Sequence, residues 1–230
     1  FKREEMLELL NHYFGRWQAK APYAPLETKA SYHQSWIQKK KDVEQLHTCI
    51  AFEGLEREHP LKYAMAIFNT VFGGGMSSRL FQKIREEQGL TYSIYSYTTA
   101  FADTGLFSIY ASMNPSQAEA VYKGIASEIA AVRKEGISEK ILNVTKEQMI
   151  SNFIIGSEST LNRMTAAGSA MLLRGKVQEM EEVIEKIEAV TQKDLTEVAE
   201  LVFANPKMSY SAVGNLKGVD FANTVEKLFS

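Results

Sequence analysis

The side chains that most often bind transition metals are sparse in this sequence. Its histidines are His12, His33, His47 and His59, and its single cysteine is Cys49. The histidines never occur at the spacing that zinc ligands have on one helix, and one cysteine cannot build a cysteine-based zinc site. We therefore expect this chain to bind no metal, and we interpret each histidine as an ordinary surface or core residue. The single cysteine also excludes an internal disulfide.

A glycine run, Gly73, Gly74 and Gly75, is the second candidate for chemistry because it comes directly before a predicted helix. Backbone N–H groups in such a loop can hold a phosphate. However, no Gly-Lys-Ser/Thr follows the run, and no dinucleotide-binding glycine pattern follows a strand. A tight joint between two helices, which only glycine permits, is therefore the preferred interpretation, and a phosphate site is the weakest.

The elements that must position these residues are helices and strands mixed along the chain. Residues of high strand propensity and the alternation of apolar with polar residues predict strands over residues 43–52, 91–97, 106–113 and 207–213. Apolar spacing predicts helices over residues 1–17, 60–72, 78–88, 115–135, 139–155, 161–173, 180–187, 192–203 and 221–229. The expected helix boundaries are a cap at Ser77 or Ser78, an end at Gly89, a cap at Ser138 and a capping-box-like start at Thr191 with Asp194. Strands and helices do not alternate strictly. The predicted fold is therefore α+β, with helices packed on an antiparallel sheet.

Three parts of unequal size are predicted for the chain. It begins without Met, at Phe1, and reads at once as an amphipathic helix whose apolar spacing matches that of the helix at 221–229. The later helix follows a strand, and the first does not. We therefore expect residues 1–20 to be the last helix of a truncated preceding domain, 21–42 to be a linker and 43–230 to be a domain. Chance similarity between two amphipathic helices explains the match equally well.

The composition excludes several classes of function. The 230 residues include 26 Lys and Arg against 28 Asp and Glu, which leaves a net charge of −2. This balance lacks the basic surface of nucleic-acid-binding proteins, and the longest apolar runs are far too short to span a membrane. We expect neither a nucleic acid nor a membrane as partner. The single cysteine and the lack of a signal-peptide pattern predict a cytoplasmic location.

A resemblance to a known family rests on a longer stretch. The segment GGGMSSRLFQKIREEQGLTYSIYSY at Gly73–Tyr97, followed by Asp103–Phe107, resembles the insulinase-type zinc peptidases, which include pitrilysin and the mitochondrial processing peptidases. Glu44–His47 resembles the Glu-Gln-x-His strand of that family, and Ile187–Thr191 also lies in its usual place. The resemblance covers nearly the whole chain. It implies the processing-peptidase-like metallopeptidase-half fold, with this chain as the C-terminal, non-zinc domain of a bacterial-type member.

The resemblance also implies a function. In this family of hydrolases, the N-terminal domain carries the zinc motif His-x-x-Glu-His, so zinc is expected in the full-length protein and this chain alone should be inactive. An Arg and a Tyr seven residues apart reach toward the zinc site from the second domain or half, and Arg85 and Tyr92 have that spacing. The residues alone fit simpler interpretations, in which Arg85 complements a helix C-terminus and Tyr92 packs on a strand neighbour. The family further implies that the glycine run faces a substrate chamber, which ranks second for these residues.

The predicted partners follow from the same resemblance. The substrate is expected to be a peptide or an unfolded polypeptide, and the chain is expected to close a chamber with the N-terminal zinc domain, in a homo- or heterodimer. The predicted activity is that of a zinc-dependent metalloendopeptidase that degrades or processes peptides. The alternative is a catalytically inactive structural or peptide-binding partner subunit, because some family members have lost the zinc motif.

Overall fold

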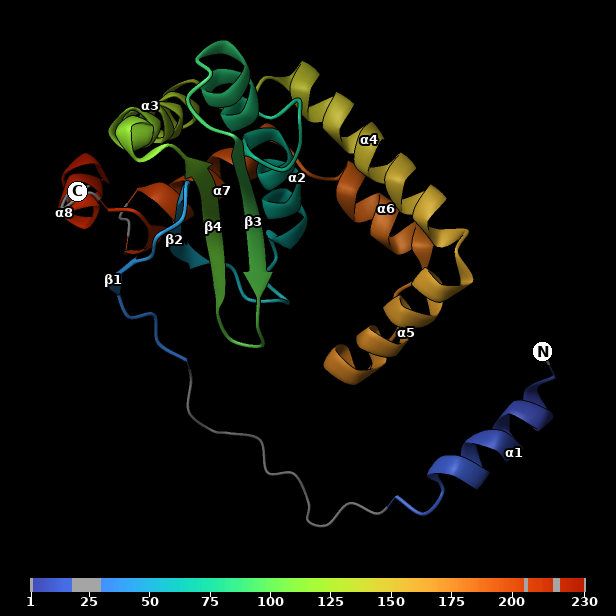
Figure 1. Cartoon of the computed structure of the whole chain (residues 1–230). Coiled ribbons are helices and arrows are strands. Elements are labelled where there is room, and N and C mark those ends of the chain that lie inside the picture. The colour runs from blue at the N-terminus through green and yellow to red at the C-terminus, as the bar shows by residue number, and fades with distance from the viewer. Residues whose placement is uncertain (1, 18–29, 205–206, 217–219, 230) are drawn as a thin grey trace. The chain divides into compact units, whose positions relative to one another are not determined.

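The structure is a computed structural model that describes residues 2–17, 30–204, 207–216 and 220–229 (Figure 1). The chain divides into two compact units, Phe1–Ala30 and Ser31–Ser230. The first unit contains helix α1 (Arg3–Phe14), in which no residue is buried. This confirms the amphipathic helix predicted near the N-terminus. Part of the predicted linker lies outside the described residues.

The second unit is built on a five-stranded sheet with the strand order β1-β5-β2-β4-β3. The strands are β1 (Trp36–Lys40), β2 (Leu46–Gly54), β3 (Ser93–Ala100), β4 (Gly105–Met113) and β5 (Met208–Gly214). Neighbouring strands in this sheet run antiparallel, except that β1 and β5 are parallel. The predicted α+β fold is confirmed, with four of the strands found within three residues of their predicted bounds.

Strand β1 was not predicted, because its residues 36–40 fall within the expected linker. Trp36 lies opposite Tyr210 in the β1–β5 register, and the two ring centroids are 6.2 Å apart. The end of the strand is polar, with Lys39 and Lys40 exposed. Lysines are typical of an edge strand that must not pair with another chain. The same lysines weakened the apolar alternation from which a strand is recognised.

Helices cover one face of this sheet, and a further group of helices lies beside them. The helices of the second unit are α2 (Lys62–Phe72), the π-helix η1 (Phe81–Glu87), the short 3₁₀ turn η2 (Pro115–Gln117), α3 (Ala118–Glu135), α4 (Glu139–Ser157), α5 (Thr160–Arg174), α6 (Met180–Glu188), α7 (Gln192–Phe203) and α8 (Phe221–Phe229). Helix α7 packs on β2, α2 on β3, and α8 on β1 and β5, while α3 packs on α7 and α8. Helices α4, α5 and α6 form a separate group beside α2 (Figure 1).

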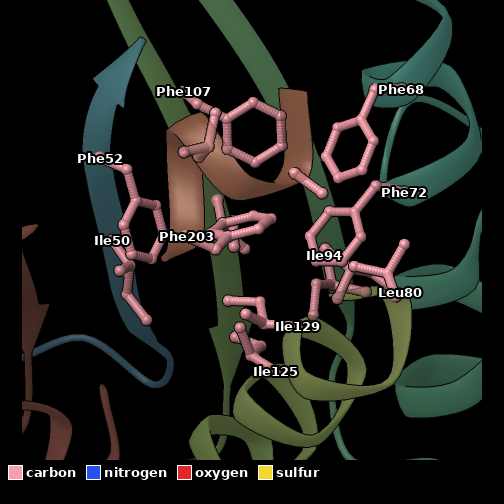
Figure 2. Packing of buried hydrophobic residues seen from close by; sticks show 14 of the residues in the cluster. Ile50, Phe52, Phe68, Phe72, Leu80, Ile94, Phe107, Ile125, Ile129 and Phe203 are labelled. Carbon is pink, nitrogen blue, oxygen red and sulfur yellow. The ribbon is translucent and has the colours of Figure 1, made fainter. Parts of the chain in front are cut away.

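The core between the sheet and the helices is strongly aromatic. Phe203 of α7 lies at its centre, with its ring centroid 5.1 Å from that of Phe52 and 5.6 Å from those of Phe72 and Phe107. Figure 2 shows these rings pointing toward one another from β2, β4, α2 and α7. All four side chains are buried. Because the rings come from segments far apart in the sequence, their packing fixes the helical layer on the sheet.

A buried pair of tyrosines adds a polar contact to this core. The hydroxyl oxygens of Tyr122 in α3 and Tyr210 in β5 are 2.8 Å apart. Burial disfavours the charged phenolate, so desolvation raises the pKa of Tyr122 to about 12 and also raises the pKa of Tyr210. In both residues the folded state therefore favours the neutral hydroxyl.

This pair predicts a loss of stability in alkali. A raised pKa in the folded state gives a contribution to stability that is complete below the unfolded pKa of 10.0 and is lost as the pH rises through about 12. Each tyrosine should lower the free energy of unfolding by up to roughly 1.4 kcal/mol per pH unit in that range. Urea denaturation between pH 8 and pH 11.5 measures this slope. The Tyr122→Phe/Tyr210→Phe variant should show a clearly shallower slope, and an unchanged slope would contradict the assignment to this pair.

Candidate functional site

The glycine run joins α2 to the segment that leads into β3. Gly73 is buried, and its carbonyl oxygen accepts a hydrogen bond of 2.9 Å from the backbone N–H of Ser96 in β3. A Cβ atom at Gly73 would lie 2.5 Å from that backbone nitrogen and 2.4 Å from the Ser96 hydroxyl oxygen. Such distances are far below van der Waals contact. The interpretation of the run as a tight joint is therefore confirmed for Gly73, although the joint is made with a strand.

The other two glycines differ from Gly73 because they are exposed. A Cβ atom at Gly74 would lie 2.8 Å from the Cα of Thr70, whereas a Cβ atom at Gly75 would meet nothing within 4 Å. Met76 follows with 76% of its surface exposed. The tip of this loop is therefore open and carries an accessible apolar side chain. That the three glycines line a substrate chamber stays a prediction.

The helical segment after the loop is anchored by its apolar side. Leu80 and Ile84 are fully buried, and Gly124 of α3 leaves room for Ile84, whose Cδ1 would lie only 3.2 Å from a Cβ atom at that position. The prediction that Ser77 or Ser78 caps this helix is wrong, since η1 has no side-chain cap. The Ser78 hydroxyl is buried and has no hydrogen-bond partner among the described residues. Packing, and not capping, therefore holds this segment.

Arg85 lies in the last turn of η1, as predicted. Its guanidinium carbon is 4.6 Å from the centroid of the Phe81 ring, and its Nε is 3.8 Å from a carboxylate oxygen of Glu86. The side chain is 40% exposed. Gly89 then reverses the chain with a left-handed φ of 62°, and its N–H donates to the Arg85 carbonyl. The predicted turn at Gly89 is thus confirmed.

Tyr92 follows this turn and directly precedes β3. The backbone N–H of Tyr92 and the hydroxyl of buried Thr91 both donate to the Ser112 carbonyl, at 3.0 and 2.6 Å, so the backbone is held in place. The Tyr92 side chain is 71% exposed. Within the described part of the chain it forms no ring contact or hydrogen bond, which argues against simple packing on a strand neighbour. Arg85 and Tyr92 thus stand on either side of one rigid turn, and their side chains do not pair with each other.

The uncovered face of the sheet carries a polar aromatic cluster that no sequence motif marks as a site. The rings of Tyr95 and Tyr110 lie 4.9 Å apart, those of Tyr95 and Tyr97 lie 6.0 Å apart, and Nδ1 of His47 is 2.7 Å from the Tyr110 hydroxyl. The three tyrosines thus pack against one another on this face of the sheet. Beside them, burial raises the pKa of the Cys49 thiol, so the neutral thiol is favoured over the reactive thiolate.

The described residues do not form a zinc site. Among them, no group of three or more His, Cys, Asp and Glu side chains is placed to hold a metal ion. Besides His47, two further histidines contact nearby groups, since Nδ1 of His59 accepts from the Leu61 N–H and Nε2 of His33 is 2.8 Å from the Ser31 hydroxyl. In the same ranges, no helix has the length and apolar character needed to cross a membrane.

Comparison with known proteins identifies the family. Residues 1–149 match the sequence family described as the peptidase M16 inactive domain. The chain belongs to the peptidase M16 family. A relative of this M16 chain, the uncharacterized zinc protease YmxG of Bacillus subtilis, is 35% identical over 200 residues, which cover 87% of the chain and 49% of YmxG. The chain therefore spans about half the length of that relative. The predicted resemblance to the insulinase-type zinc peptidases is confirmed.

Solved structures share the fold of the M16 chain. The crystal structure of a peptidase M16 inactive domain from Pseudomonas fluorescens superimposes with a TM-score of 0.80 at 21% identity, covering 94% of this chain and 51% of that one. A chain of complex III2 from Candida albicans gives the same TM-score at 19% identity, covering 99% of this chain and 56% of the other. At these identities the likeness establishes the fold alone.

Proposed function

We propose that the full protein is a zinc-dependent metalloendopeptidase that degrades or processes peptides, and that this chain closes its chamber and presents Arg85 and Tyr92 to the scissile carbonyl. One observation carries the proposal. Among the described residues, the guanidinium of Arg85 and the phenol of Tyr92 have no hydrogen-bond partner, and they flank the left-handed turn at Gly89 on a segment anchored by buried neighbours. An exposed pair on rigid backbone is what recognition of a reacting group requires.

The chemistry of the pair suits peptide hydrolysis. Attack on a peptide carbonyl places negative charge on its oxygen, and N–H or O–H groups directed at that oxygen stabilise the transition state more than the ground state. The guanidinium of Arg85 has five N–H donors and a permanent positive charge, and the Tyr92 hydroxyl adds one O–H donor. Glu86 is too far from Arg85, at 3.8 Å, for a strong hydrogen bond that would occupy those donors.

Zinc is proposed to lie in the part of the protein outside this chain. The described residues offer no metal-binding group, whereas YmxG is described as a zinc protease. The substrate class that we propose is a peptide or unfolded polypeptide. A cytoplasmic location stays a prediction.

We further propose the domain organisation predicted from the sequence, with residues 1–20 as the last helix of a preceding domain, 21–42 as a linker and 43–230 as the non-zinc domain. Strand β1 moves the start of the proposed domain into the predicted linker, because it pairs with β5 in the same sheet. Helix α1 supports this proposal, because the described residues of its own unit leave its apolar side chains uncovered, among them Leu9, Leu10 and Phe14. An apolar stripe of this kind normally packs against another surface. The proposed partners are the zinc domain and a second subunit, in a homo- or heterodimer.

The test compares the full-length protein with this chain. A labelled unfolded peptide is incubated with each, with and without a chelator, and the zinc content of each is measured. Zinc-dependent cleavage by the full-length protein, with neither zinc nor cleavage in the 230-residue chain, supports the proposal. Cleavage by the chain alone contradicts it. A folded full-length protein without zinc or activity would favour the alternative, an inactive partner subunit, a role consistent with the fold shared with a chain of complex III2.

A further inference from the structure

Phe81 is the first residue of η1, and Arg85 lies in its last turn. The guanidinium carbon lies 4.6 Å from the centroid of the Phe81 ring. A cation above an aromatic face at this distance is attracted by the negative electrostatic potential of the ring. The ring is half-buried and follows Leu80, which is fully buried, so its own freedom to move is restricted. An exposed arginine with such a neighbour has one side of its guanidinium plane covered.

The backbone that carries this stack is a π-helix that is fixed at its end. A π-helix has a wider turn than an α-helix, and such turns often occur at functional sites. The N–H groups of Gly89 and Leu90 donate to the carbonyls of Arg85 and Ile84, which closes the end of the segment at distances of 3.1 Å. Both residues of the stack are thus carried by backbone that is fixed at its end by hydrogen bonds and at its middle by buried Ile84.

We infer that Phe81 is a positioning residue, which holds the guanidinium of Arg85 in the orientation that meets the scissile carbonyl; this inference rests on the proposed function. Stacking uses the face of the guanidinium and leaves its N–H groups free, because they point outward in the plane of the group. A side chain that is already oriented loses less conformational freedom in the transition state. Phe81 itself need not touch the substrate.

The test measures peptide hydrolysis by variants of the full-length protein. Phe81→Leu keeps an apolar side chain and removes the ring, and we expect kcat/KM to fall about fivefold, mainly through kcat. Phe81→Tyr keeps the ring and should retain wild-type activity. Phe101→Leu is the matched control, because Phe101 is an exposed aromatic outside β3 and β4, and it should leave kcat/KM unchanged. Equal activity of Phe81→Leu and wild type would overturn the inference.

A double-mutant cycle separates positioning from other roles. In an Arg85→Ala background, Phe81→Leu should have no further effect on the residual activity. A fivefold loss in both backgrounds would mean that Phe81 contacts the substrate or supports the fold. That result would overturn the inference about Phe81 and leave the catalytic role proposed for Arg85 intact. If Arg85→Ala itself left activity unchanged, the catalytic role proposed for Arg85 would fall, and the inference with it.

The stacking itself has a readout that does not depend on activity. In protein labelled with ¹⁵N-arginine, the Hε signal of Arg85 should be shifted upfield by the ring current of Phe81. The shift should persist in Phe81→Tyr and disappear in Phe81→Leu. An unshifted Hε signal in the wild-type protein would show that the guanidinium does not rest on the ring in solution and would overturn the inference, whatever the activity of Arg85→Ala.

Discussion

Replacing Arg85 with alanine or Tyr92 with phenylalanine in the full-length protein is expected to lower kcat/KM by about 10²–10³ in each case, the usual loss when one donor to a developing oxyanion is removed. Neither change should unfold the protein. The Tyr92 hydroxyl has no hydrogen-bond partner among the described residues, and Arg85 is 40% exposed, with a loose ion pair to Glu86 and its stack on Phe81. Loss of such contacts usually lowers the free energy of unfolding by no more than about 1 kcal/mol. Steady-state kinetics and thermal melts of the same preparations test both expectations.

Matched controls lie close to the pair. Tyr95→Phe removes a hydroxyl from the same strand region, on the uncovered face of the sheet, and Lys83→Ala removes an exposed cation from the same helical segment. Both should retain wild-type kinetics. Arg85→Lys keeps the charge and loses the planar arrangement of donors, so its activity should fall between those of wild type and Arg85→Ala. Near-wild-type turnover in the Arg85→Ala/Tyr92→Phe double variant would refute the assignment.

The sequence predicted the elements whose pattern is local. The capping box of Thr191 with Asp194 is present, and Ser138 caps α4, because these interactions involve residues three positions apart. Gly89 was predicted to end its helix for a similar reason, since a left-handed residue is needed there. Strand β1 and the lack of a cap at Ser78 were missed. Both depend on contacts with residues distant in the sequence, namely the pairing of β1 with β5 and the packing of Ile84 against Gly124 of α3.

The candidate site could be predicted only in part, because some of its features also depend on contacts between residues distant in the sequence. The spacing of Arg85 and Tyr92 came from the family resemblance, and the local turn between them is predictable from Gly89. The stack of Arg85 on Phe81 could have been suspected from their separation of four residues. The π-helical form was not predictable, since the sequence FQKIREE suits an ordinary α-helix. The exposure of the Tyr92 phenol was not predictable either, because it depends on which residues surround Tyr92 in the folded chain.

Gly73 provides the second large effect, this time on stability. Gly73→Ala should lower the free energy of unfolding by roughly 3 kcal/mol, the sum of overpacking and a weakened buried hydrogen bond. Its φ is −153°, outside the left-handed region, so the need for glycine comes from its contacts with β3. The added methyl group would meet the backbone nitrogen of Ser96 at 2.5 Å, and would disturb the 2.8 Å hydrogen bond from the Ser96 hydroxyl to Asn69.

Gly75→Ala is the matched control, because its methyl group would meet nothing within 4 Å. Its free energy of unfolding should differ from that of wild type by less than about 0.5 kcal/mol. Urea denaturation of the 230-residue chain measures both variants under the same conditions. Adding Ser96→Ala to Gly73→Ala should restore only part of the stability, since it removes the clash with the hydroxyl and leaves the clash with the backbone. If Gly73→Ala were as stable as Gly75→Ala, the loop would be free to move away from β3, and the Arg85–Tyr92 segment that follows would lose one of its proposed anchors.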